Sequence, residues 1–316
     1  MNNKKVFCEA LTEGNTEKLL KIPKSDLHNH SVKGCRRKWL EERLNLSFPE
    51  PPEKFDGLEG MQKWFSSSIK PYCTGKDGII LRWEGAFAEA KRNNIVRLCM
   101  NFGPDEIELV GGMDSFTDLI TGFHKQYCPG TRFEPELTYI SACDIDHETG
   151  MMDKYVSSGF FRSIDVCGGE NIKPFEAFLP LYRKAERYHL IKKMHVGESG
   201  SAEDVRRAAD ILGLNEVHHG IHARQSVEVM RFLADNGVIL NVCPSSNVML
   251  GYAEDYKDHP IKVLYENGVK VTINTDDLLI FDSSVENEYL TLYNAGTLSA
   301  EELNEIRING LKGKYE

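Results

Sequence analysis

Residues 191–213, IKKMHVGESGSAEDVRRAADILG, contain the repeating unit from which the fold is predicted. The first six residues form a short apolar run that is typical of a buried strand. After a turn, SAEDVRRAADILG is long enough for a helix and ends at Gly213, as helices often do. The segment therefore predicts one strand followed by one helix.

The same unit recurs along the chain. Eight runs are predicted to be strands, namely 25–30, 94–102, 134–142, 160–166, 191–196, 216–219, 237–242 and 269–275. Helix-length stretches such as EGAFAEAKRNN, KPFEAFLPLYRKAERY and ARQSVEVMRFLADN lie between them. Strands that alternate with helices indicate an α/β fold with a parallel sheet. Eight such units favour a single (β/α)8 TIM barrel domain over residues 1–316, with a doubly wound open sheet as the alternative.

Composition excludes some partners. The 316 residues carry a formal net charge of -10, which argues against a nucleic-acid or anionic-membrane partner. No apolar run is long enough for a transmembrane helix, and the N-terminus has no continuous apolar signal core. The eight cysteines are scattered without a C-x-x-C pair, which favours reduced thiols and a cytoplasmic location.

A departure from the regular alternation follows the first strand. The Pro-rich patch at 49–52 begins a loop excursion, and FDGLEGMQKWF (55–65) comes directly after it. Its apolar residues fall on one face of a helix; they are Phe55, Leu58, Met61, Trp64 and Phe65. The segment at about 50–72 is therefore either a surface helix docked on the core or a helical lid over a cleft.

Metal-ligating side chains stand at the ends of several predicted strands. These residues are His28, His30, His195, His219, Asp276 and Asp277. In a barrel the carboxyl ends of all strands open onto one face, where active sites form. Alternation along a strand also makes His28 and His30 point the same way. The sequence therefore predicts one cluster at this face.

Three imidazoles and one carboxylate form a ligand set that suits zinc best and also accepts iron, cobalt or nickel. A coordination position left for water would make the site catalytic, because the cation lowers the pKa of that water. The H-x-H pair alone is a weak signal, since it also occurs in unrelated metal phosphoesterases. The later His and Asp at strand ends strengthen it.

Five motifs in order resemble the adenosine deaminase family of amidohydrolase-type metal barrels. They are PKSDLHNH (23–30), HVGE (195–198), HHGIH (218–222), CPSSN (243–247) and NTDD (274–277). The resemblance runs from about residue 22 to 310. The segment 55–65 also resembles the helical gate that this family places over the purine.

The resemblance implies a role for each site residue. One Zn²⁺ per chain would be bound by His28, His30, His195 and Asp276. Asp276 would also accept a hydrogen bond from the attacking hydroxide, and His219 would orient the water. Glu198 would protonate purine N1 while zinc-activated water attacks C6.

Three further positions are implied to contact the substrate. Asp277 would hydrogen-bond N7, and the backbone N–H of Gly168 would address N3, although Gly169 is an equally available neighbour. His30 is expected to touch the substrate as well as the metal. Strand alternation predicts that His218, next to His219, turns away from the site and packs against a helix.

One stretch departs from the family pattern. The family continues its first motif as His-Leu-acid-Gly, and the acid contacts the 5′ side of the sugar. Here the chain reads His-Ser-Val-Lys-Gly (30–34), followed by CRRK (35–38). The 5′-hydroxyl contact is therefore missing or rebuilt. The basic cluster is either an anion site or a solvated helix start.

The predicted function is zinc-dependent hydrolytic deamination of adenosine or a related aminopurine nucleoside, giving the inosine-type product and ammonia. Alternatives are an adenine or modified-purine deaminase, another metal-dependent barrel hydrolase, or a binding protein without turnover. Retention of Glu198, His219 and all four ligands argues against the last. The H-x-E…P-C-x-x-C signature of cytidine-type deaminases is absent. The expected partner is a small purine, and the sequence leaves the oligomeric state open.

Overall fold

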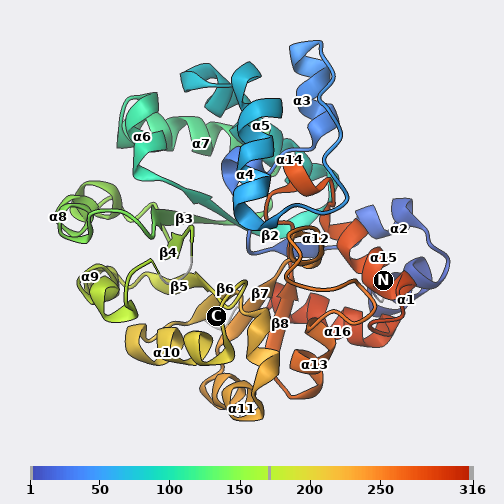
Figure 1. The fold of residues 1–316 in the computed structure, drawn as a ribbon. Helices are drawn as coiled ribbons and strands as arrows, with labels where there is room; N and C mark the ends of the chain where they lie inside the picture. The colour runs from blue at the N-terminus through green and yellow to red at the C-terminus, as the bar shows by residue number, and fades with distance from the viewer. Residues whose placement is uncertain (1–2, 170–171, 313–316) are drawn as a thin grey trace.

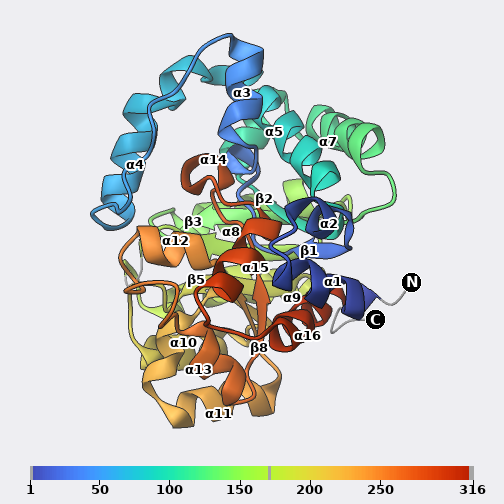
Figure 2. The ribbon, with the colours of Figure 1, turned by 90° about the vertical axis from the view of Figure 1, so that its right-hand side faces the viewer.

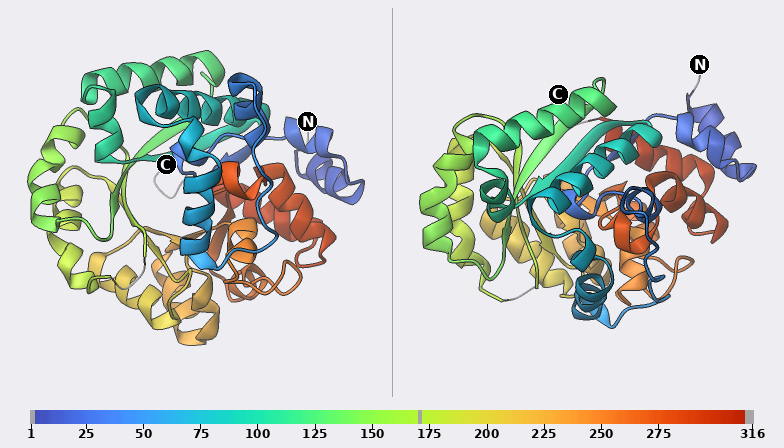
Figure 3. Two further views of the ribbon diagram at one scale, coloured as in Figure 1. Left: turned by 45° about the horizontal axis from the view of Figure 1, so that its top comes forward. Right: turned by 90° about the horizontal axis from the view of Figure 1, so that it is seen from above.

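Eight parallel strands form a nearly closed barrel in the computed structural model, which describes residues 3–169 and 172–312. Neighbours in the sheet follow chain order from the first strand to the last, and Figure 3 shows the resulting ring with helices outside it. The strands are β1 Lys24–Asp26, β2 Ile95–Phe102, β3 Arg132–Ile140, β4 Ser163–Cys167, β5 Ile191–Val196, β6 Glu216–His219, β7 Ile239–Val242 and β8 Lys270–Ile273. The predicted (β/α)8 barrel is confirmed.

Helices connect the strands and surround the barrel (Figure 1). They are α1 Asn3–Thr12, α2 Thr16–Lys21, α3 Arg37–Leu44, α4 Gly57–Ser68, α5 Gly75–Arg92, α6 Pro104–Val110, α7 Met113–Tyr127, α8 Ile145–Val156, α9 Leu179–Arg187, α10 Ala202–Leu212, α11 Val227–Asn236, α12 Pro244–Met249, α13 Ile261–Glu266, α14 Leu278–Phe281, α15 Val285–Asn294 and α16 Ala300–Leu311. Their apolar faces pack against the outside of the barrel and form the main hydrophobic core. Among the described residues, no helix is long and apolar enough to cross a membrane.

Local sequence explains where these helices begin. At α10, the side chain of Ser201 accepts a hydrogen bond from the backbone N–H of Asp204, and the Asp204 carboxylate accepts one from Ser201 N–H. This reciprocal cap satisfies two of the backbone donors that a helix N-terminus leaves free. The helix therefore starts directly after the turn that carries the candidate acid Glu198.

The first strand is shorter than predicted. β1 ends at Asp26, so His28 and His30 lie beyond it rather than at the end of a strand over 25–30. They are held instead by the segment that follows β8, because Asp276 N–H donates to His28 O at 2.9 Å and His30 N–H donates to Asp276 O at 3.2 Å. These bonds close the ring between its first and last strands.

The chain between β1 and β2 makes the predicted excursion. Figure 2 shows α3 and α4 standing out from the body of the barrel. Phe55, Met61 and Phe65 are buried in a second apolar cluster, and Leu58 and Trp64 are partly buried against it. The five apolar residues of this segment therefore share one face, as the spacing predicted.

Candidate active site

A cavity of about 600 Å³ opens at the carboxyl ends of the strands. Leu58 and Met61 of α4 line it, so the excursion helix forms part of its wall. Seven of the predicted site residues line it too, namely His30, Gly168, His195, Glu198, His219, Asp276 and Asp277. His28 lies beneath the surface, with 1% of the residue exposed. Gly169, the alternative to Gly168, is not among the lining residues.

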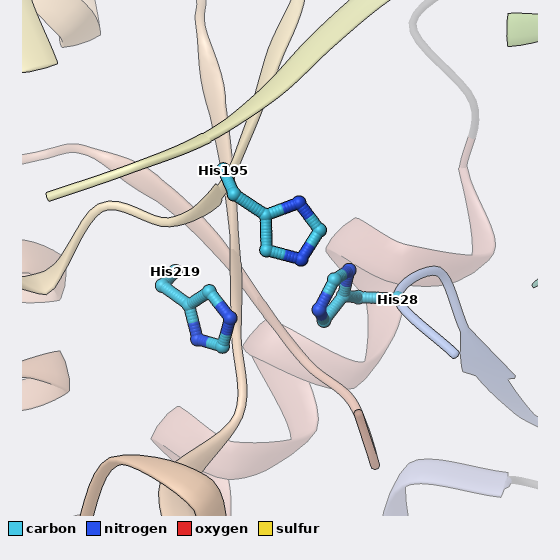
Figure 4. A group of neighbouring side chains, drawn as sticks. All are labelled: His28, His195 and His219. Carbon is cyan, nitrogen blue, oxygen red and sulfur yellow. The ribbon is translucent and has the colours of Figure 1, made fainter. Parts of the chain in front are cut away.

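The predicted metal ligands gather at one point of this cavity. Nε2 of His28 and Nε2 of His30 each lie 3.2 Å from Asp276 Oδ1. The ring centroid of His195 is 4.6 Å from that of His28 and 5.3 Å from that of His30. Figure 4 shows the rings of His28, His195 and His219 turned toward one another, and each offers a nitrogen within 4.8 Å of the other two.

The ring of His195 is oriented by a carboxylate behind it. Its Nδ1 lies 3.0 Å from an oxygen of Asp165, so Nδ1 carries the proton and Nε2 presents its lone pair. Burial raises the pKa of Asp165, but His195 outweighs burial and holds the pKa below its ordinary value. This pairing fixes the tautomer that a metal ligand needs.

The lone pair of His195 has no partner within the described chain. Its Nε2 is buried and makes no hydrogen bond there. A buried polar atom without a partner costs free energy, and a cation among the surrounding nitrogens and Asp276 would remove that cost. The donor set of three imidazoles and one carboxylate therefore fits a divalent metal such as zinc.

Glu198 reaches the cavity through a tight turn after β5. Gly197 has a φ of +72°, and a Cβ there would lie 2.1 Å from Cγ2 of Val205, so only glycine fits. The turn brings Glu198 Oε1 to 3.6 Å from His219 Nε2. Its side chain is 12% exposed and lines the cavity beside the histidine cluster. A carboxyl group in this place can exchange protons with a bound ligand.

Comparison with known proteins agrees with the site. The adenosine deaminase family model matches residues 147–315. A putative adenosine/adenine deaminase of Treponema pallidum is 30% identical over 289 residues, which cover 90% of this chain and 97% of that protein. An adenosine deaminase of Clostridium acetobutylicum is 33% identical over 335 residues, covering 95% of each. The chain belongs to the adenosine deaminase family.

The fold of this adenosine deaminase family member is also found in a crystal structure. The adenine deaminase of Arthrobacter aurescens superposes with a TM-score of 0.78 at 20% identity, covering 92% of each chain. The resemblance that the five motifs predicted is confirmed, and the chain is an enzyme of the hydrolytic deaminase type.

His218 contradicts the prediction from strand alternation. It does not pack against a helix; it lies inside the barrel, where its Nε2 is 3.0 Å from Glu136 Oε1 and its ring is 4.0 Å from that of His28. His219 still reaches the cavity because its φ is +65°, which breaks the alternation at the end of β6. Both histidines of the HHG step therefore face inward.

The altered loop after His30 places a lysine in the deaminase cavity. Nζ of Lys33 donates to Asp277 Oδ2 at 2.8 Å, and Val32 lines the cavity with an apolar side chain. The basic residues that follow are used elsewhere: Arg36 pairs with Glu89, and Arg37 pairs with Glu50 and Asp282. Neither arginine is among the residues that line the cavity, so the structure does not favour an anion site there.

Several residues that orient the site were not predicted from the sequence. The amide of Asn101 contacts His30 Nδ1 at 2.8 Å, and that of Asn247 contacts His219 Nδ1 at 3.2 Å. Asp165 contacts His195 from the middle of β4. Asp165 had a signal in the sequence, since a carboxylate inside the apolar run FFRSIDV needs a buried partner.

Proposed function

We propose that this deaminase hydrolyses the C6–NH₂ bond of adenosine or a related aminopurine, with one zinc ion held by His28, His30, His195 and Asp276. The observation that carries the proposal is that His30, His195 and Asp276 line one cavity beside Glu198, with His28 buried directly behind them against Asp276 and His195. In the reaction, water supplies the oxygen that becomes the 6-oxo group, and the amino group leaves as ammonia. Zinc, when bound, would supply a water molecule acidic enough to act as the nucleophile.

The chain's own residues would move the protons. Glu198 would give a proton to N1, which makes C6 electrophilic; its place in the cavity lining, 3.6 Å from His219, supports this role. His219, 3.6 Å from Glu198 and 3.9 Å from Asp276, lies where it can orient the water and take its proton. The Asp276 carboxylate accepts a hydrogen bond from the same water.

The remaining lining residues would hold the substrate. Gly168 offers its backbone N–H to N3, His30 touches the ring beside the metal, and Asp277 faces the five-membered ring. Leu58 and Met61 of α4 would cover the base and exclude water. A volume of about 600 Å³ is in the ordinary range for small-ligand sites and leaves room for a sugar.

Ammonia release over a panel of substrates tests the proposal. Zinc-loaded protein should release ammonia from adenosine, adenine or an N6-unsubstituted relative, and should leave cytidine and cytosine unchanged. Comparison of kcat/KM across nucleosides and bases would then identify the preferred aminopurine. Release from none of the aminopurines, or preference for an aminopyrimidine, would contradict the proposal. A cytoplasmic location and one ion per chain stay predictions.

A further inference from the structure

Lys33 occupies a defined place in the cavity. It closes the 3-10 turn Ser31–Lys33 directly after the proposed ligand His30, and its backbone N–H donates to His30 O at 2.7 Å. Its side chain is 21% exposed and lines the cavity, whereas the side chain of Asp277, its partner, is only 3% exposed. The turn therefore carries the ammonium group inward.

Two contacts fix this ammonium group. Nζ donates to Asp277 Oδ2 at 2.8 Å, and it lies 5.7 Å from the ring centroid of Phe65 on α4. Lys33 is thus a charged donor with one hydrogen bond to Asp277 and two N–H groups left for the cavity.

The proposed reaction determines which part of a purine faces this pair. N1 and N7 flank C6 on opposite sides of the ring system. Glu198, which would address N1, groups with His219 and Asp276, whereas Asp277 groups with His30 and Asp276. With C6 at the cluster and N1 at Glu198, N7 points toward Asp277 and Lys33.

The chemistry of N7 selects Lys33 rather than Asp277 as its direct partner. N7 carries a lone pair and needs a donor, whereas a carboxylate paired with an ammonium group is an acceptor. We propose that Lys33 is a specificity-determining residue that donates a hydrogen bond to N7 of the substrate, with Asp277 as its positioning residue. This inference rests on the proposed purine deaminase function.

Direct binding measurements test the contact without turnover. Purine riboside and its 7-deaza analogue both lack the leaving amino group, and they differ at position 7 as a nitrogen or a C–H. Calorimetry should show that zinc-loaded wild-type protein binds purine riboside roughly 10- to 150-fold more tightly, the range for a hydrogen bond with a charged partner. In Lys33→Met this ratio should collapse toward unity, mainly through weaker binding of purine riboside.

Matched variants separate this effect from a general loss of fold. Lys63→Met removes an exposed lysine from α4, the helix that carries Phe65, and should keep the wild-type ratio. Lys33→Arg retains a charged donor and should keep part of the preference for purine riboside. If Lys33→Met does not fold, this partial loss in Lys33→Arg is the result that tests the contact. An unchanged ratio in Lys33→Met, or no preference for purine riboside in the wild type, would overturn the inference about Lys33. If the wild-type protein still released ammonia from adenosine, the proposed function would stand. Binding of neither ligand together with no aminopurine turnover would overturn both.

Discussion

Asp276 and His28 are joined twice. The backbone N–H of Asp276 donates to the carbonyl oxygen of His28 at 2.9 Å, and the Asp276 carboxylate lies 3.2 Å from His28 Nε2. The first contact closes the barrel and the second brings two proposed ligands together. A substitution at Asp276 would keep the backbone bond, but Asp276 has a φ of +59°, which most side chains avoid, so its replacement would strain the backbone as well as remove a proposed ligand. His195 and its partner are therefore cleaner targets.

The contact between Asp165 and His195 should control metal affinity. Asp165→Asn removes the charge that holds the ring in its ligand tautomer, so zinc affinity should fall by about 10- to 100-fold. His195→Ala should lose most of the metal. Asp146→Asn, an exposed position on α8, is the control. The zinc content of each protein is measured by elemental analysis after dialysis against increasing concentrations of chelator. If Asp165→Asn retained as much zinc as the control, the contact between Asp165 and His195 would not affect metal affinity.

Replacement of Glu198 should separate chemistry from binding. Glu198→Gln keeps the size of the side chain but removes the proton that N1 requires, so kcat should fall by about 100-fold or more. Zinc content and the affinity for purine riboside should stay close to wild type, because Glu198 is not a proposed ligand. Near-normal turnover by the variant with its metal retained would mean that another group protonates the ring.

The charge of the substrate should affect its rate of turnover, because acidic side chains line the cavity. Asp105, Asp144 and Glu148 line it, and Lys33 is the sole lysine or arginine among the described lining residues. Like charges repel, so kcat/KM for adenosine should exceed that for AMP by roughly tenfold or more. Glu148→Gln should reduce the difference in kcat/KM between adenosine and AMP, because it removes one negative charge from the cavity lining. Equal kcat/KM values for the two substrates, or a preference for AMP, would contradict the prediction that the acidic lining repels a phosphate group.

A buried carboxyl group predicts the pH dependence of stability. Burial raises the pKa of Glu288 to about 7 from its ordinary 4.5, although its hydrogen bond from Ser245 N–H opposes this. Between these values the folded state keeps a proton that the unfolded state has released, so stability falls as pH rises through this window. The effect is ~3 kcal/mol at most, at ~1.4 kcal/mol per pKa unit.

Urea unfolding from pH 4.5 to 7.5 measures this slope. Glu288→Gln cannot titrate, so its free energy of unfolding should decline less over the range than that of the wild type. Asp26, whose pKa is raised to about 6 by burial, contributes in the same direction in both proteins, so the wild-type slope should exceed that of the variant without the variant's slope falling to zero. Identical slopes for the two proteins would contradict the assignment to Glu288.

The barrel and most of the cluster were predictable because they depend on short-range patterns. Strand β5 was predicted with its true bounds, since an apolar run is followed there by a turn and an amphipathic helix. His195 and Glu198 were found from the same unit. The five motifs then fixed the family, because their order is far more specific than any one of them.

What the sequence did not show depends on backbone dihedrals and on contacts between distant strands. His219 has a φ of +65°, which no strand pattern predicts, so His218 was placed on the wrong side. His218 instead meets Glu136 from β3, which in turn lies 2.9 Å from Lys193 of β5. Such a buried polar network forms only when the barrel brings its strands together.

The central claim is that this chain is a zinc-dependent purine deaminase, and its most direct test is ammonia release from adenosine as a function of metal content. Protein stripped by a chelator should release ammonia only at the background rate. Activity should return in proportion to added zinc and level off at about one ion per chain, as expected for one cluster of three imidazoles and a carboxylate. Full activity in demonstrably metal-free protein, or zinc-loaded protein that deaminates no aminopurine, would contradict the claim.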